Sequence, residues 1–250
     1  MITQADTQQR LMELLLGKKR LLQPGSNNKK LASNDTETWI LNLAPHTQNS
    51  KGKSLCGHAS PSCIKACLFK AGHGKMPAVE RTRRLNTEVF IHHRETFIQL
   101  LHQELWGLHL KATQEGSVIA VRTNGTSDID FYQLILNQTG VDVLKEYTGL
   151  VAYDYTKDYK KWEKYRGTPY HLTFSRSEIN WLQARWVLEQ GGNTAVVFYP
   201  KVPKTWQGFP VHDGSFSDER WLDPPGYIIG LIYKKVPGDD PLTNPFVVKV

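Results

Sequence analysis

The sequence predicts an α/β protein that forms a partial or distorted β/α barrel of about six mostly parallel strands. Apolar runs of five or six residues recur along the chain, and stretches with helical spacing separate most of them. Strands that alternate with helices form right-handed βαβ units and a parallel sheet. A length of 250 residues is also enough for a full hydrophobic core. We therefore expect a single β/α domain over residues 39–250, preceded over residues 1–38 by an N-terminal helix and a polar, basic connector.

The N-terminal extension begins with residues 1–16, where Leu11, Leu14, Leu15 and Leu16 give one apolar side of a short amphipathic helix. Residues 17–37 are polar and basic, which predicts a connector or an exposed hairpin and the part of the chain most prone to disorder. The first strand of the domain follows at residues 39–43 and stops at Pro45.

The rest of the chain predicts one long helix and five more strands. Apolar residues recur at helical spacing from Pro77 to about residue 114. A shorter helix is expected over residues 180–190, ended by Gly191 and Gly192. The strands are expected at residues 118–122, 150–156, 171–175, 194–199 and 227–233.

Composition limits the class of protein and its partners. A hydrophobic content of 40% with 22% charged residues is typical of a soluble globular protein. The chain has no run of eighteen apolar residues and no signal peptide, so we expect no membrane association and a location in the reducing cytoplasm. The net charge of +7 permits nucleic acid or phosphorylated ligands as partners. The sequence has no RNA-binding or helix-turn-helix motif, so we interpret the positive net charge as that of a basic surface.

All three cysteines lie in one short stretch with the spacing C-x6-C-x3-C. Cys63 and Cys67 are four residues apart, so a helix places them on one face. Ser60 and Pro61 are a suitable N-cap and first turn for that helix. Cys56 lies in the loop before it, so the three thiols can converge on one point.

Several interpretations of this stretch compete. The thiols could be buried as small apolar groups, but the surrounding loop is polar. A disulfide conflicts with the odd count and the missing secretory segment. Zinc would need His58 or His73 as a fourth ligand. The spacing lacks the two close pairs typical of zinc, so it favours a [4Fe-4S] cluster held by Cys56, Cys63 and Cys67. The fourth iron is then open, or it is bound by one of His58, His73, Asp128 and Asp154.

Ligands of parallel α/β folds bind at the carboxyl ends of the strands. After the second predicted strand come Asn124, Thr126, Ser127 and Asp128, which could hold a small polar ligand. Alternatively, Ser127 or Asp128 caps the next helix. The following strand ends contribute further candidates, namely Asp154 and Lys157, then Ser175, Arg176 and Glu178.

An acidic run precedes the last strand and contains His212, Asp213, Asp218 and Asp223. Histidine with carboxylates can hold Mg²⁺ or Mn²⁺ for phosphodiester hydrolysis. The run has no fixed ligand spacing, and Asp-Gly and Asp-Pro are common turn formers, so turns are the preferred interpretation.

From residue 39 onward the chain resembles the phage gene-product-eighty-eight family. The resemblance rests on Leu41-Asn-Leu-Ala-Pro-His46, the cysteine stretch, Thr123-Asn-Gly-Thr-Ser-Asp128, Tyr153-Asp-Tyr-Thr-Lys157, His171-Leu-Thr-Phe-Ser-Arg-Ser-Glu178 and Leu222-Asp-Pro-Pro-Gly226. It implies a bacteriophage protein that acts in the cytoplasm of the host cell.

A weaker similarity is to radical S-adenosylmethionine enzymes. Those are partial β/α barrels in which three cysteines after the first strand hold a [4Fe-4S] cluster, and its open iron binds S-adenosylmethionine. Their usual spacing is C-x3-C-x2-C, and this chain also lacks their Gly-Gly-Glu-like segment after the second strand. The similarity implies redox or radical chemistry on an unknown small molecule, and it leaves open whether the chain is an enzyme.

Two alternatives from other classes remain at this point. The first is a non-catalytic cluster protein that transfers electrons to a partner or senses redox state. The second is a zinc-stabilised module that binds nucleic acid.

Overall fold

A mostly parallel ten-stranded sheet organises the chain in the computed structural model, which describes residues 2–25 and 36–250. The strand order is β1-β2-β3-β4-β5-β6-β9-β8-β7, and β10 pairs with β6. The strands from β2 to β6, and then β9 and β8, are parallel to their neighbours, while β1 and β7 are antiparallel. Their bounds are Leu22–Pro24, Thr38–Leu41, Ile119–Arg122, Leu150–Thr156, Tyr170–Ser175, Thr194–Tyr199, Thr205–Trp206, Phe209–Asp213, Ile228–Ile232 and Val248–Lys249 for β1 to β10.

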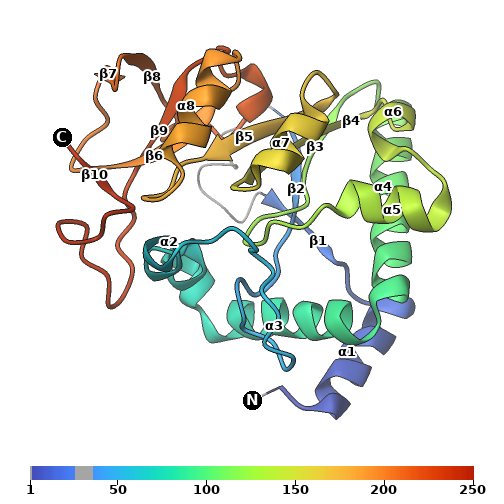
Figure 1. Ribbon diagram of the computed structural model, residues 1–250. Helices are drawn as coiled ribbons and strands as arrows, with labels where there is room; N and C mark the ends of the chain where they lie inside the picture. The colour runs from blue at the N-terminus through green and yellow to red at the C-terminus, as the bar shows by residue number, and fades with distance from the viewer. Residues whose placement is uncertain (1, 26–35) are drawn as a thin grey trace.

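The parallel strands β2 to β6 lie side by side in the order in which they occur in the chain. Right-handed connections that always advance in one direction place their helices on one face of the sheet. Figure 1 shows α4, α5, α7 and α8 following one another around this face. The helices α1 to α8 span Gln4–Leu15, Pro61–Lys65, Pro77–His92, Arg94–Glu115, Phe131–Thr139, Val143–Glu146, Tyr159–Tyr165 and Trp181–Glu189.

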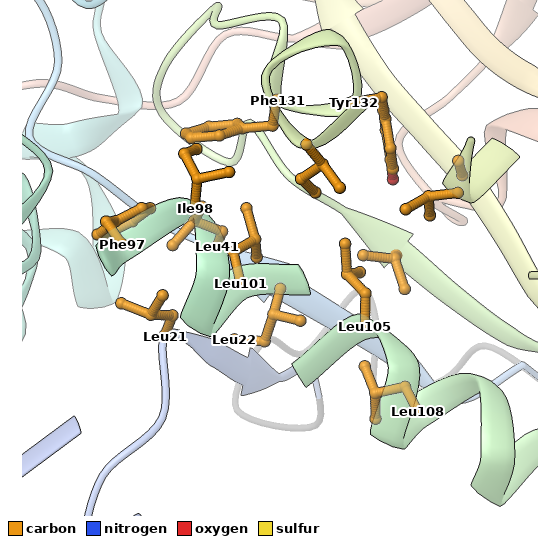
Figure 2. Close-up of a cluster of buried hydrophobic side chains, with 14 of the residues drawn as sticks. Leu21, Leu22, Leu41, Phe97, Ile98, Leu101, Leu105, Leu108, Phe131 and Tyr132 are labelled. Atoms are coloured by element: carbon orange, nitrogen blue, oxygen red, sulfur yellow. The ribbon is translucent and has the colours of Figure 1, made fainter. Parts of the chain in front are cut away.

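The largest core cluster lies between this face of the sheet and the helices. Leu101 and Leu105 of α4 are fully buried there, together with Leu41 of β2 and Leu22 of β1 (Figure 2). Full burial of a leucine side chain contributes about 1.5–3 kcal/mol relative to exposure. Alternate residues of each strand face the other way, so Arg122 of β3 points away from the helices although Val121 lies in the core.

The structure confirms the expected N-terminal helix and the main strands, with boundaries that differ by at most three residues and coincide for β4 and β6. Leu11 and Leu14 of α1 join the main core cluster, and β1 falls within the expected polar connector. Residues 26–35 of that connector lie outside the described residues.

Two expectations need correction. The barrel is not confirmed, because the sheet is open and its end strands β1 and β7 do not pair with each other. The single helix expected over residues 77–114 is two helices, α3 and α4, which run in clearly different directions (Figure 1). The break falls at His93, whose φ of −132° and ψ of 50° are not helical. No proline or glycine marks this position, so the periodicity of the sequence continues across it.

Candidate functional site

A cavity of about 400 Å³ lies at the carboxyl ends of the parallel strands. Its floor and walls come from strand ends, from the loop that carries the cysteines, from the loop after β3 and from Phe246 near the C-terminus. Apolar side chains line much of it, including Ile64, Phe69 and Val197. A concave, largely apolar space with a few polar groups is typical of a small-molecule site.

The cysteine loop is fixed against the strand ends by hydrogen bonds to its polar residues. Ser60 caps α2 through the backbone nitrogen of Cys63, as its sequence predicts. Glu178, after β5, accepts hydrogen bonds from the Ser60 hydroxyl at 2.7 Å and from the Ser62 backbone nitrogen at 3.2 Å. Asn244 donates to the Ser62 carbonyl oxygen at 3.2 Å. The short helix α2 is thus held from two distant parts of the chain.

All three cysteines line the cavity and are free, partly buried thiols. Burial raises the pKa of the Cys56 thiol to about 11, and burial also raises that of Cys67. The Cys56 thiol donates to the Thr126 carbonyl oxygen, with 3.6 Å between sulfur and oxygen. Cys56 is therefore protonated at neutral pH and joins the cysteine loop to the loop after β3.

The iron–sulfur interpretation is wrong. Among the side chains that the structure describes, no group of three or more His, Cys, Asp and Glu is arranged so that it could hold a metal ion. The same finding overturns the electron-transfer cluster protein and the zinc-stabilised nucleic-acid module, because both of these alternatives need a metal. The spacing of the cysteines predicted that the three thiols can converge on one point. The three residues line the same cavity, but the spacing could not predict how the thiols are oriented.

Three of the four proposed fourth ligands are engaged elsewhere. His58 is 56% exposed and lies 3.5 Å from Asp158. Asp128 is paired with Lys161 at 3.2 Å and accepts hydrogen bonds from Thr156. The other two candidates are Asp154, which is fully buried, and His73, whose side chain lies outside the described part.

Hydrogen bonds between its own residues stabilise the loop after β3. The Asn124 side chain accepts from the Ser127 hydroxyl at 2.9 Å and from the Ile129 backbone nitrogen at 2.7 Å. Asn124, Thr126, Ser127 and Asp128 all line the cavity. Neither Ser127 nor Asp128 caps the next helix, because the N-cap of α5 is Asp130. Contact of the four residues with a ligand stays a prediction.

Asp154 and Arg176, two further sequence candidates, are not among the described residues that line the cavity. The Asp154 carboxylate accepts from the hydroxyls of Thr123 and Tyr170 at 2.8 and 2.7 Å and from the Asn124 backbone nitrogen at 2.8 Å. Burial raises its pKa, while nearby cations and these hydrogen bonds act in the opposite direction. Arg176 donates to the carbonyl oxygens of Pro245 and Phe246, so it anchors the C-terminal segment.

The acidic run expected before the last strand crosses the face of the sheet that lies opposite the helices. Its short helix η4, Arg220–Leu222, packs against β4 and β5. Asp218 pairs with Arg122 at 3.2 Å, and Asp223 pairs with Arg220 at 3.1 Å. The segment thus covers this face and supplies partners for buried cations.

Two basic residues face the cavity from the sheet. Arg122 donates a hydrogen bond from its guanidinium nitrogen Nη1 to Asp218, and its side chain is 18% exposed. Lys157, directly after β4, donates from Nζ to the Ser175 hydroxyl at 2.7 Å and lies 5.3 Å from the centre of the Phe246 ring. The sequence pointed to Lys157 and Ser175 as strand-end residues but gave no signal for Phe246.

None of the helices in the described part of the chain has the length and apolar character needed to cross a membrane. A comparison with curated proteins finds no match, and a comparison with solved structures also finds none. The similarity to radical S-adenosylmethionine enzymes thus gains no support. The sequence model of one family, described as Gene product 88, matches residues 14–240 and supports a bacteriophage origin. This match covers most of the sequence, so the chain belongs to the Gene product 88 family.

Proposed function

We propose that this protein binds a small organic molecule with an apolar body in the cavity at the carboxyl ends of its parallel strands. The proposal is supported by the convergence there of loops from β2, β3, β4 and β9 on a space of about 400 Å³. Binding pockets for small molecules have volumes of about 300–1,000 Å³ and combine apolar walls with a few polar groups. We expect the protein to act in the cytoplasm of the phage's host.

We assign the three thiols a structural role as part of the cavity wall. Attack by a cysteine requires the thiolate, and burial keeps the Cys56 thiol protonated at neutral pH. Cys63 packs against the cluster of Ala66 and Phe246, on the side where the C-terminal segment closes the cavity.

Binding is tested with the neutral fluorophore N-phenyl-1-naphthylamine, whose emission rises in apolar surroundings. Ala195 is buried and lines the cavity from the rigid strand β6, so Ala195→Trp fills part of the space. Ala78→Trp is the matched control, because Ala78 is exposed in the first turn of α3. We expect saturable binding at one site in the wild type and in the control, and its loss in Ala195→Trp, with folding checked by circular dichroism.

Equal binding to all three proteins, or none to the wild type, would contradict the proposal. S-adenosylmethionine, which stays a predicted cofactor, is added as a competitor in the same assay. Displacement of the fluorophore by it would identify one class of ligand.

A further inference from the structure

We infer that the ligand of this cavity is an organic anion, and that Lys157 with Ser175 forms the site for its negatively charged group. This inference rests on the proposed function, because it concerns the same cavity. It is carried by the distribution of paired and unpaired charges among the residues that line the space.

The described residues that line the cavity include four cations, Lys70, Arg122, Lys157 and Lys234, but only two carboxylates, Asp128 and Asp218. Both carboxylates are already paired. Lys161, which is itself buried, neutralises Asp128, and Arg122 neutralises Asp218. The lining therefore carries an excess of positive charge.

Lys157 is a lining cation that takes no part in this pairing, and its ammonium group lies beside the apolar wall, 5.3 Å from the centre of the Phe246 ring. No carboxylate of the described residues lies within ion-pair distance of its ammonium group, whose polar contact is the Ser175 hydroxyl at 2.7 Å. The Phe246 ring on its other side offers an aromatic face but no full negative charge. An ammonium group can donate three hydrogen bonds, so Lys157 retains capacity for a ligand.

The local structure holds this lysine in place. Its backbone nitrogen donates to Asp128 at 2.8 Å, and Phe174 pairs with Thr156 across the parallel strands, so Ser175 follows beside Lys157. The Ser175 hydroxyl accepts from Lys157, and its own proton remains available for donation to an anion. A cation and a hydroxyl side by side, next to an apolar wall, suit a carboxylate or a phosphate attached to an apolar body.

Arg122 adds a second group of the same sign. Its Nη1 is bonded to Asp218, and its Nε lies 3.8 Å from an Asp154 oxygen but has no hydrogen-bond partner among the described residues. The side chain is partly exposed where it lines the cavity. A guanidinium group has five N–H donors, so Arg122 retains capacity for a ligand oxygen. We assign Arg122 to a polar group of the ligand and Lys157 to its full negative charge.

The test compares two fluorophores that differ in one charged group. 8-Anilinonaphthalene-1-sulfonate carries a sulfonate on the aromatic body that N-phenyl-1-naphthylamine presents without charge. Lys157→Met should weaken binding of the sulfonate about tenfold to a hundredfold, the usual worth of a hydrogen bond to a charged group, and change binding of the neutral probe less than about twofold. Lys160→Met, on the exposed surface of α7, removes the same charge outside the cavity and should change neither.

Equal weakening of both probes, or of neither, in Lys157→Met would overturn the inference while the proposed function stands. Failure of both probes to bind the wild type would instead overturn the proposed function. A competition experiment on the wild type needs no variant. Benzoate or phenyl phosphate should displace the sulfonate probe, and which of the two competes better distinguishes a carboxylate from a phosphate ligand. If benzyl alcohol displaced the sulfonate probe as effectively as either anion does, the role of charge would be refuted.

Discussion

Replacement of Asp154 by alanine is expected to destabilise the protein strongly, because its carboxylate satisfies four buried donors. Three of these are the hydroxyls of Thr123 and Tyr170 and the backbone nitrogen of Asn124, at 2.7–2.8 Å, and the fourth is the side-chain amide of Asn124 at 3.2 Å. Asp154 itself has no exposed surface. Each buried donor left without an acceptor costs about 1–3 kcal/mol.

The expected loss for Asp154→Ala is about 3–5 kcal/mol, the range observed when one partner of a buried charged network is removed. The simple sum over the four donors is an upper limit. Arg122, whose Nε lies 3.8 Å from an Asp154 oxygen, also keeps its ion pair with Asp218 when Asp154 is removed. For a chain of this size the loss corresponds to a fall in Tm of about 6–20 °C.

Equilibrium unfolding in urea measures this loss directly. Asp142→Ala is the matched control, because Asp142 pairs with Lys145, whose side chain is 79% exposed. An exposed pair of this kind is worth about 0–1 kcal/mol. A free energy of unfolding for Asp154→Ala within about 1 kcal/mol of the wild type would refute the reasoning.

A double-mutant cycle separates the hydrogen bond of Tyr170 from the rest of the network. Tyr170→Phe should cost about 1.5–3 kcal/mol in the wild type, as for a hydrogen bond to a charged group, and much less in the Asp154→Ala background, where the acceptor is already gone. Additive losses would show that the Tyr170 hydroxyl acts independently of Asp154.

Three further outcomes are expected. Gly230→Ala in β9 should lower the free energy of unfolding by about 1–3 kcal/mol, because the added Cβ would lie 2.4 Å from a methyl carbon of Val202; an unchanged urea midpoint would contradict this overpacking. Cys56 should react slowly with iodoacetamide at neutral pH and faster as pH approaches about 11, where its thiol ionises; a rate that levels off near pH 9 would show an ordinary thiol. Asp6 should lose its contribution to stability only as pH falls from its ordinary value of 3.8 toward about 2, because hydrogen bonds from Thr3 lower its pKa; the wild type and Asp6→Asn should differ above pH 4 and converge near pH 2.

The sequence predicted the alternation of strands and helices well, because β3, β4, β5, β6 and β9 each have buried apolar residues bounded by turn residues. It did not predict β7, β8 and β10, since these strands are short or have mostly half-exposed and exposed residues, which leaves little apolar pattern. The break between α3 and α4 was missed because apolar residues such as Phe90 and Phe97 continue at helical spacing across His93.

The rule that ligands bind at the carboxyl ends of parallel strands predicted that the cysteine stretch and the loop after β3 lie close together. Both segments line one cavity in the structure. The rule could not say where side chains point. Asp154 follows Tyr153 in β4, and the alternation of the strand turns its carboxylate toward Tyr170 and the helices. Phe246 reaches the cavity from the far end of the chain, and such long-range contacts leave no local signal.

The order of the strands has a consequence for the synthesis of the protein. Each strand from β3 to β6 pairs with the strand made just before it, so the growing chain always presents a finished edge to the next strand. β9 breaks this order, because it inserts between β6 and β8 after β8 has been made. The segment over the second face of the sheet, and Phe246 beyond it, leave the ribosome after most of these strands. A nascent chain can therefore complete most of its sheet while the wall of the cavity still lacks Phe246.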